Sequence, residues 1–283
     1  MPSRRITATS ALPMRIAALV AALVTASVAG PALAQTEQRG TGYVSNLSGP
    51  LFAVKADGSR RVLAIQSTVD AGDTLVTEDK TYARVRFTDQ SEVTLRPGTQ
   101  FQIENYSFDR QAPDRDNSAF RLLKGAFRTV TGLIGKRGNR DAYKLSTATA
   151  TIGIRGTVFG VTVCQAAEAA AKEAKTPEEA EAAAKKAKEA CGGLEAGTYV
   201  NVIDGQVAVD PLSAAPLVLS AGQFGYAPAV GPAVQLPADP GVGRMFSPPA
   251  SFILRDDAPP PGALGELGSA SARPSGGGAC DVR

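Results

Sequence analysis

The chain has 283 residues and a formal net charge of +3, and it contains neither His nor Trp. The absence of His removes the commonest general base, the nucleophilic triads that contain His, and most zinc and transition-metal sites. The sequence has no D-x-D-x-D-G calcium loop, no Gly-rich phosphate loop and no G-x-S-x-G motif. We therefore expect no catalytic, cofactor-binding or metal-binding residues, and no enzyme activity.

Residues 1–34 have the features of a secretory signal peptide. Three arginines precede an uncharged run from Ile16 to Ala29, and Ala32 and Ala34 supply a small-x-small cleavage pattern. A helix of about 14 residues spans only about 21 Å, less than the roughly 30 Å of a bilayer's hydrocarbon core. We expect cleavage and export, by the general or the twin-arginine route, with no stable membrane span afterwards.

Cleavage of this peptide changes the charge balance. The remaining chain has 27 basic and 27 acidic residues, because the three arginines are lost and no acid is lost with them. A neutral protein has no general attraction to nucleic acid, so we expect no nucleic-acid partner.

The β-rich part of the sequence begins at Gly42, where short apolar runs alternate with turn residues. We expect a β domain over 40–228, with a solenoid-like or sandwich-like winding of short strands. Residues 106–117 are predicted to form a surface loop, and the Pro- and Gly-rich tail 229–283 is predicted to be mostly disordered. The expected strands are Tyr43–Leu47, Leu51–Val54, Arg61–Ile65, Thr74–Val76, Ala83–Phe87, Glu92–Leu95, Tyr199–Ile203, Gln206–Val209 and Leu217–Leu219, with a turn at Asp204-Gly205.

A longer strand is expected from Ser146 to Cys164. The glycines Gly153 and Gly156 interrupt its alternation and predict two sites of close backbone approach. We interpret both glycines as structural. Arg155 and Thr157 complete the central motif of this strand.

A cluster of cations, Lys136, Arg137 and Arg140, lies in the run GKRGNRD, on an otherwise neutral chain. One interpretation is a patch that attracts an anionic partner, such as a phosphate-bearing glycan or an acidic protein face. The other is a solvated loop without a specific partner.

Residues 165–190 form an insertion composed almost entirely of Ala, Glu and Lys. Thr176 as a cap and Pro177 at the first helical position predict two helices back to back, of about 11 and 14 residues. Cys164 and Cys191 flank this helical hairpin, and in an exported chain they predict a disulfide across its base. Cys280 is left over, as a free thiol or an intermolecular partner.

Several segments in order resemble the periplasmic FecR domain, the sensor portion of iron-citrate-type regulators of sigma factors. The resemblance implies an all-β, solenoid-like domain in the periplasm that acts through protein contacts. Gln90 stands where the family commonly has Gly, so we expect a longer or type I turn there. The matching segments are AGDTLVT (71–77), ARVRFTDQSEVTLRPGT (83–99), LLKGAFR (122–128), TATATIGIRGTVFGV (147–161), YVNVIDGQVAV (199–209) and LSAGQ (219–223).

The sequence differs from that family plan, because it shows no cytoplasmic N-terminal domain and no durable transmembrane helix. We therefore expect a stand-alone exported module that binds or senses an envelope protein. The alternative is an envelope structural protein that binds peptidoglycan or polysaccharide through the cluster at Lys136 and through its tail.

Overall fold

The computed structural model describes residues 40–137, 139, 141–172, 174–212, 214–245 and 252. The predicted signal peptide 1–34, Arg140, Cys280 and most of the tail lie outside the described residues. The chain divides into residues 1–38 and 39–283, and the architecture below is that of the second unit.

The described residues form fifteen strands and a few short helices, as expected for an all-β domain with an inserted helical hairpin. The strands are β1 (Gly42–Leu47), β2 (Leu51–Val54), β3 (Arg60–Leu63), β4 (Thr68–Val69), β5 (Thr74–Thr77), β6 (Ala83–Phe87), β7 (Glu92–Leu95), β8 (Gln100–Ser107), β9 (Asn117–Val130), β10 (Tyr143–Ser146), β11 (Ala150–Cys164), β12 (Gly197–Pro211), β13 (Leu217–Ser220), β14 (Phe224–Pro228) and β15 (Val234–Leu236). The helices are the 3-10 turn η1 (Pro113–Arg115), α1 (Ala167–Lys172), α2 (Pro177–Ala190) and α3 (Val242–Met245).

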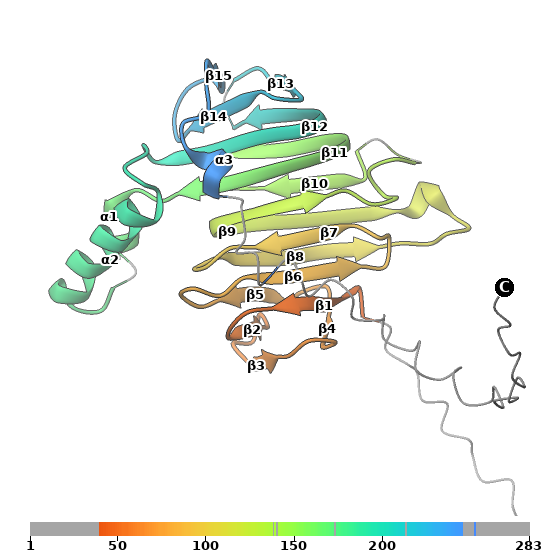
Figure 1. Ribbon diagram of the computed structural model, residues 1–283, viewed down its shortest axis with the longest axis horizontal. Coiled ribbons are helices and arrows are strands. Elements are labelled where there is room, and N and C mark those ends of the chain that lie inside the picture. Colours follow the sequence, from red (N-terminus) through yellow and green to blue (C-terminus); the bar gives the residue numbers. More distant parts are fainter. Residues whose placement is uncertain are drawn as a thin grey trace, which may run out of the picture. The chain divides into compact units, whose positions relative to one another are not determined.

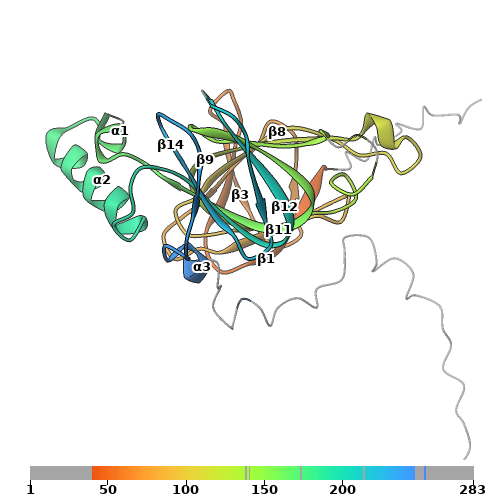
Figure 2. The same cartoon turned by 90° about the horizontal axis from the view of Figure 1, so that it is seen from above.

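The strand pairings arrange these strands in two layers that share three long strands. One layer follows the order β3-β2-β5-β8-β9-β10-β11-β12-β13, and the other follows β4-β1-β6-β7-β9-β11-β12-β14-β15. The first half of β9 pairs with β8 and β10, whereas its second half pairs with β7 and β11. Figure 1 shows the strands stacked from β3 to β15, and Figure 2 shows the two layers enclosing an interior.

Glycines allow the long strands to pass from one layer to the other. Gly125 in β9, Gly156 in β11 and Gly205 in β12 have φ values of +84°, +54° and +81°, in the region that favours glycine. The β11–β12 register shifts between Arg155 and Val158, next to Gly156. Strands that switch sheets do so at such bulges and bends.

The site of close backbone approach differs from the sequence expectation. A Cβ at Gly205 would lie 2.7 Å from the carbonyl oxygen of Gly156 and 3.1 Å from Cα of Thr157, whereas a Cβ at Gly153 would meet nothing within 4 Å. A Cβ at Gly156 would lie 3.4 Å from Cγ of Lys136 and 3.9 Å from the carbonyl oxygen of Gly135, which are ordinary contact distances. The close approach is therefore made by the partner strand. The expected turn at Asp204-Gly205 is also wrong, because β12 continues through it.

Aromatic side chains fill the interior between the layers. Phe101 and Phe120 project from one layer and Phe127 and Phe159 from the other, and all four are buried. Phe101 lies 5.2 Å from Phe120 and 5.2 Å from Phe127, measured between ring centroids. Phe127 lies 6.2 Å from Phe159. These spacings are those of favourable edge and tilted ring contacts, so the rings link both layers.

The turn between β6 and β7 is longer than a two-residue hairpin loop, as expected: residues 88–91 connect the strands, and the Gln90 amide donates to the Phe87 carbonyl at 3.0 Å. Gln90 itself adopts a φ of +69°. The neighbouring Asp89 is buried, and its carboxylate accepts hydrogen bonds from the Ser91 amide (3.0 Å), the Ser91 hydroxyl (2.6 Å) and the Tyr106 hydroxyl (3.0 Å). These bonds hold the turn in a conformation that Gln alone would disfavour.

Asp73, in the segment AGDTLVT, is a buried carboxylate with two cationic partners. Its oxygens lie 2.7 Å from Lys55 Nζ and 2.8 Å from Arg61 Nη2, and one accepts the amide of Asp70 at 3.0 Å. Burial alone would raise the pKa of Asp73, but the hydrogen bonds from Lys55, the Asp70 amide and Arg61 outweigh it and hold the pKa below its usual value. Asp73 therefore ties β5 to the β2–β3 hairpin.

We predict that Gly205→Ala destabilises the domain strongly, whereas Gly153→Ala does not. An alanine at position 205 would have to adopt a positive φ, and its Cβ would overlap the backbone of β11. Together these effects should lower the free energy of unfolding by about 3 kcal/mol. Gly153→Ala has no overlap to relieve and should leave the free energy of unfolding unchanged or about 0.5 kcal/mol higher. Urea unfolding of both variants checks this prediction. Equal decreases in the free energy of unfolding would contradict the close backbone approach at Gly205.

We predict that Asp73→Asn lowers the free energy of unfolding by about 2 kcal/mol at pH 7, because bonds to a charged carboxylate are lost. The control Asp70→Asn, whose side chain is 44% exposed, should cost less than about 1 kcal/mol. The contribution of Asp73 is present above the unfolded pKa of about 3.9 and is lost as pH falls through the lower folded pKa. Unfolding curves between pH 7 and acid should therefore converge for wild type and Asp73→Asn.

Candidate functional site

The insertion between β11 and β12 folds into the expected helical hairpin, called here the arm (165–190). α2 spans the expected 14 residues, and the Thr176 hydroxyl accepts the Glu179 amide at 3.2 Å with Pro177 at the start of the helix. α1 has only six residues, which is shorter than predicted. Helices whose apolar face is only Ala gain little from packing, so a short α1 is unsurprising.

Cys164 and Cys191 are joined by a disulfide across the base of the arm, as predicted, with their Cα atoms 5.6 Å apart. Both cysteines are buried in a small cluster with Ala126, Tyr199 and Val242, on the outer face of the layer that contains β14. The disulfide therefore fixes the arm to the β body through packed side chains.

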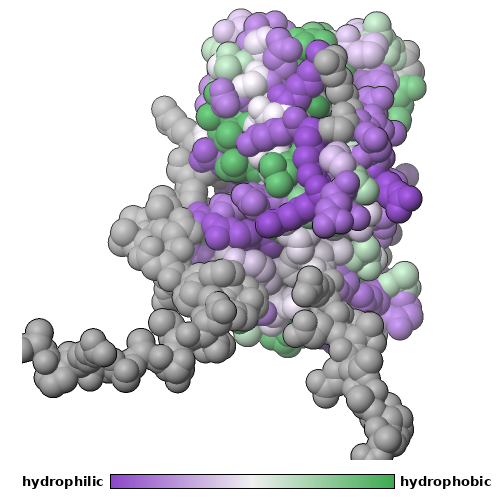
Figure 3. Space-filling model, turned by 90° about the vertical axis from the view of Figure 1, so that its right-hand side faces the viewer, coloured by the Kyte–Doolittle hydropathy of each residue, from purple (hydrophilic) through white to green (hydrophobic). Residues whose placement is uncertain are grey.

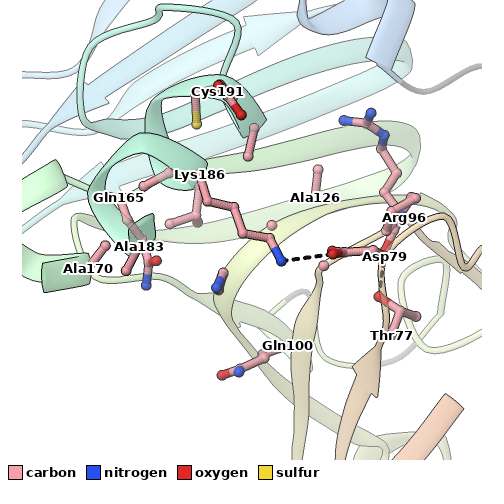
Figure 4. Close-up of a pocket in the computed structure, with 18 of the residues that line it drawn as sticks. Thr77, Asp79, Arg96, Gln100, Ala126, Gln165, Ala170, Ala183, Lys186 and Cys191 are labelled. Carbon is pink, nitrogen blue, oxygen red and sulfur yellow. Dashed lines mark hydrogen bonds and ion pairs between the residues drawn. The ribbon is translucent and has the colours of Figure 1, made fainter. Parts of the chain in front are cut away.

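A cavity of about 780 Å³ lies between the arm and the β body, and we call it the cleft. Its body wall comes from the end of β5 and the residues after it, the β7–β8 turn, the glycine bend of β9 and the end of β11. Its arm wall comes mainly from α1 and α2. Figure 4 shows Lys186 reaching from α2 to Asp79 on the body, and their Nζ–Oδ2 distance is 2.9 Å. This ion pair joins residues 107 positions apart in the sequence.

The arm wall is formed mainly by the small side chains of Ala170, Ala174, Ala183 and Ala187. Ala170 and Ala187 are the buried members of this set, at 8% and 9% exposure. The arm therefore presents alanine methyl groups to the cleft, beside the charged side chains of Glu179, Lys186 and Glu189.

The motif residues at the centre of β11 lie outside the cleft lining and form the bend between the layers. The Gly156 amide donates to the carbonyl of Gly135 at 3.0 Å, and the Thr157 amide donates to the Thr131 hydroxyl at 2.8 Å. Thr157 is buried, whereas Arg155 is exposed. These bonds connect β11 to the loop after β9, which is a structural task.

The predicted basic patch lies in that loop, on the side of the body opposite the arm (Figures 1 and 2). Arg137 is engaged internally: its Nε lies 3.1 Å from the buried carboxylate of Asp116, and it donates to the carbonyls of Asp109 (2.6 Å) and Arg110 (3.0 Å). Lys136 is exposed. Figure 3 shows this side as mainly hydrophilic with small hydrophobic areas. Arg137 thus fastens two loops together.

The β structure continues past the boundary predicted at 228, since β15 pairs with β14 and α3 follows. Val242 in α3 is buried beside the disulfide, and Phe252 is buried further along the same outer face. The Phe252 ring lies 5.8 Å from that of Tyr82 and 5.4 Å from Cζ of Arg84, and its carbonyl accepts a hydrogen bond from Asn46. These contacts cover polar residues of β1 and β6.

The pKa values of four tyrosines are raised above the usual value of about 10, so these hydroxyls stay protonated at neutral pH. Burial raises the pKa of Tyr199 to about 12, with smaller contributions from Tyr226 and Glu195. Burial also raises the pKa values of Tyr106 and Tyr143. Within the described ranges, no three or more Cys, Asp or Glu side chains are grouped to hold a metal ion.

None of the helices in the described part of the chain combines the length and apolar character that a membrane crossing needs.

Residues 73–208 match the family described as FecR protein, in the region where the motifs predicted that resemblance. Two crystal structures of a candidate anti-sigma factor from Parabacteroides distasonis ATCC 8503, at 1.65 Å and 2.50 Å resolution, resemble the chain at 15% identity, with TM-scores of 0.38 and 0.39. Each match covers 59% of this chain and 61% of the other, so the chain spans about three fifths of their length. No curated protein matches the chain.

Sequence reasoning identified the arm and its disulfide but not the cleft. The body wall joins the segments 76–80, 96–100 and 124–126, which only the fold brings together. One signal in the sequence could have indicated a cleft: the arm is inserted between two consecutive strands, so its two ends must lie side by side. In the structure β11 and β12 pair up to Cys164 and Gly197.

We predict that the double variant Cys164→Ala, Cys191→Ala lowers the free energy of unfolding by about 3 kcal/mol, because the unfolded chain regains the entropy of an open loop. The melting temperature should fall by roughly 10 °C. Cys280→Ala is the matched control and should leave the melting temperature unchanged. An equal fall in both variants would contradict the structural role of the disulfide.

Proposed function

We propose that the protein is an exported, non-catalytic FecR-domain module that contacts an envelope protein through the arm and the cleft, and that this contact serves signalling in the periplasm. The match to the FecR protein family at 73–208 supports a regulatory role. The observation that carries the choice of surface is the cleft of about 780 Å³ between the arm and the body.

The arm suits a contact surface for physical reasons. It projects from the β body, as Figures 1 and 2 show, and its disulfide holds its base in place. A surface held by a rigid scaffold loses less conformational entropy on binding than a free loop does. Binding sites are commonly carried by segments positioned in this way.

Binding of a cell-wall glycan through the basic patch gains no support from the loop geometry. Arg137 already uses its guanidinium for Asp116 and two backbone carbonyls, which leaves exposed Lys136 as the described cation of the predicted set. A single exposed lysine is a weak determinant of glycan binding.

Site-specific photocrosslinking in producing cells tests the proposal. A photoreactive residue at Ala183 faces the cleft, and one at Val62 on β3 is the control, because Val62 is 72% exposed at the edge of the β body. We expect one envelope protein to be crosslinked at Ala183 and not at Val62. No adduct at Ala183, or the same adducts at both positions, would overturn the proposal.

A further inference from the structure

The two signs of charge in the cleft differ in how they are satisfied. Each acidic residue that lines it has a partner: Asp79 pairs with Lys186, and Glu78 bonds to Arg60 at 3.1 Å. Glu179 accepts the Lys175 amide at 2.9 Å, and Glu189 lies 4.0 Å from Lys185. The acidic groups of the lining are therefore already occupied.

The cations of the body wall have no such partners. Lys80, Arg96 and Lys124 line the cleft, and none of them forms an ion pair with the residues that the structure describes. The Nε atom of Arg96 is buried without a hydrogen-bond partner. Leaving a buried donor unsatisfied costs free energy, so this wall is electrostatically suited to an incoming anion.

A second unsatisfied group lies in the same lining. Thr162 of β11 is 3% exposed, and its hydroxyl has no hydrogen-bond partner in the described structure. A buried polar group without a partner calls for an explanation, and an absent ligand is one. Because Thr162 belongs to β11, this hydroxyl is a part of the body wall of the cleft.

We propose that the cleft binds an acidic, extended polypeptide segment of a partner protein, whose carboxylates meet Lys80, Arg96 and Lys124 while its small apolar side chains lie on the alanines of the arm. The inference rests on the proposed function and adds the chemistry of the partner. The volume of about 780 Å³ suits a short segment. No aromatic residue of the described chain lines the cleft, so a sugar ring finds no stacking surface there.

The test measures fluorescence anisotropy with the full mature chain and three labelled decapeptides. The probe alternates Glu and Ala, and the controls replace Glu by Lys or by Gln. We expect binding of the Glu peptide alone, weakened by salt because exposed charges are screened. Equal binding of all three peptides, or no binding of the Glu peptide, would overturn the inference.

Matched variants locate the binding. Arg96→Glu with Lys124→Glu should weaken binding of the Glu peptide at least tenfold, whereas Lys136→Glu with Arg155→Glu carries the same charge change outside the cleft and should alter it less than twofold. If the first variant does not fold, Arg96→Gln with Lys124→Gln replaces it, with an expected loss of at least fivefold. Equal losses in the cleft variant and its control would overturn the site.

A chain that ends at Phe252 identifies the source of the acidic segment. Unchanged affinity for the Glu peptide supports an external partner. Binding that is at least fivefold tighter would show that residues 253–283 occupy the cleft in the full chain, and it would overturn the assignment to a partner protein. Crosslinking at Ala183 without Glu-peptide binding would overturn the acidic chemistry alone and leave the proposed function standing.

Discussion

The structure depends on one constraint, which is that β9, β11 and β12 each serve both layers of the β body. A strand that changes layers must bend. The bend needs a residue that adopts a positive φ without strain, or one whose lack of a Cβ lets another strand approach closely, and glycine meets both needs. Gly125, Gly156 and Gly205 meet this need. The bends place Phe120 and Phe127 of one strand on opposite sides of the same interior, so one continuous chain builds both walls of the core.

The same bends position the candidate site. Gly125 lies in the cleft lining, and a Cβ there would lie 2.7 Å from Cα of Thr99, in the β7–β8 turn. That turn carries Arg96, so the packing that lets β9 change layers also fixes the body wall of the cleft. The arm, in contrast, is held by the disulfide and by the ion pair between Lys186 and Asp79. The body wall of the site is thus fixed by strand packing, whereas the arm wall is held by one disulfide at its base and one ion pair to the body.

Local patterns predicted much of the fold and little of the site. Glu92–Leu95 matches β7, because alternating polarity and flanking turns mark a half-buried strand. Gly205 was misread as a turn, since a glycine with positive φ looks alike in a turn and in a bent strand. Arg137 looked free because Asp116, its partner, is 21 positions away. The cleft depends on contacts as distant as Asp79 with Lys186, which periodicity does not encode.

The position of the arm has a consequence for how the protein can vary. β11 and β12 form an antiparallel hairpin that pairs up to Cys164 and Gly197, and the disulfide from Cys164 to Cys191 closes the insertion at this last pair. Changes in the length or sequence of the segment between the cysteines therefore leave the register of both strands intact. The β11–β12 hairpin is therefore an insertion site, at which evolution or a protein engineer can exchange one binding element for another without changing the β scaffold.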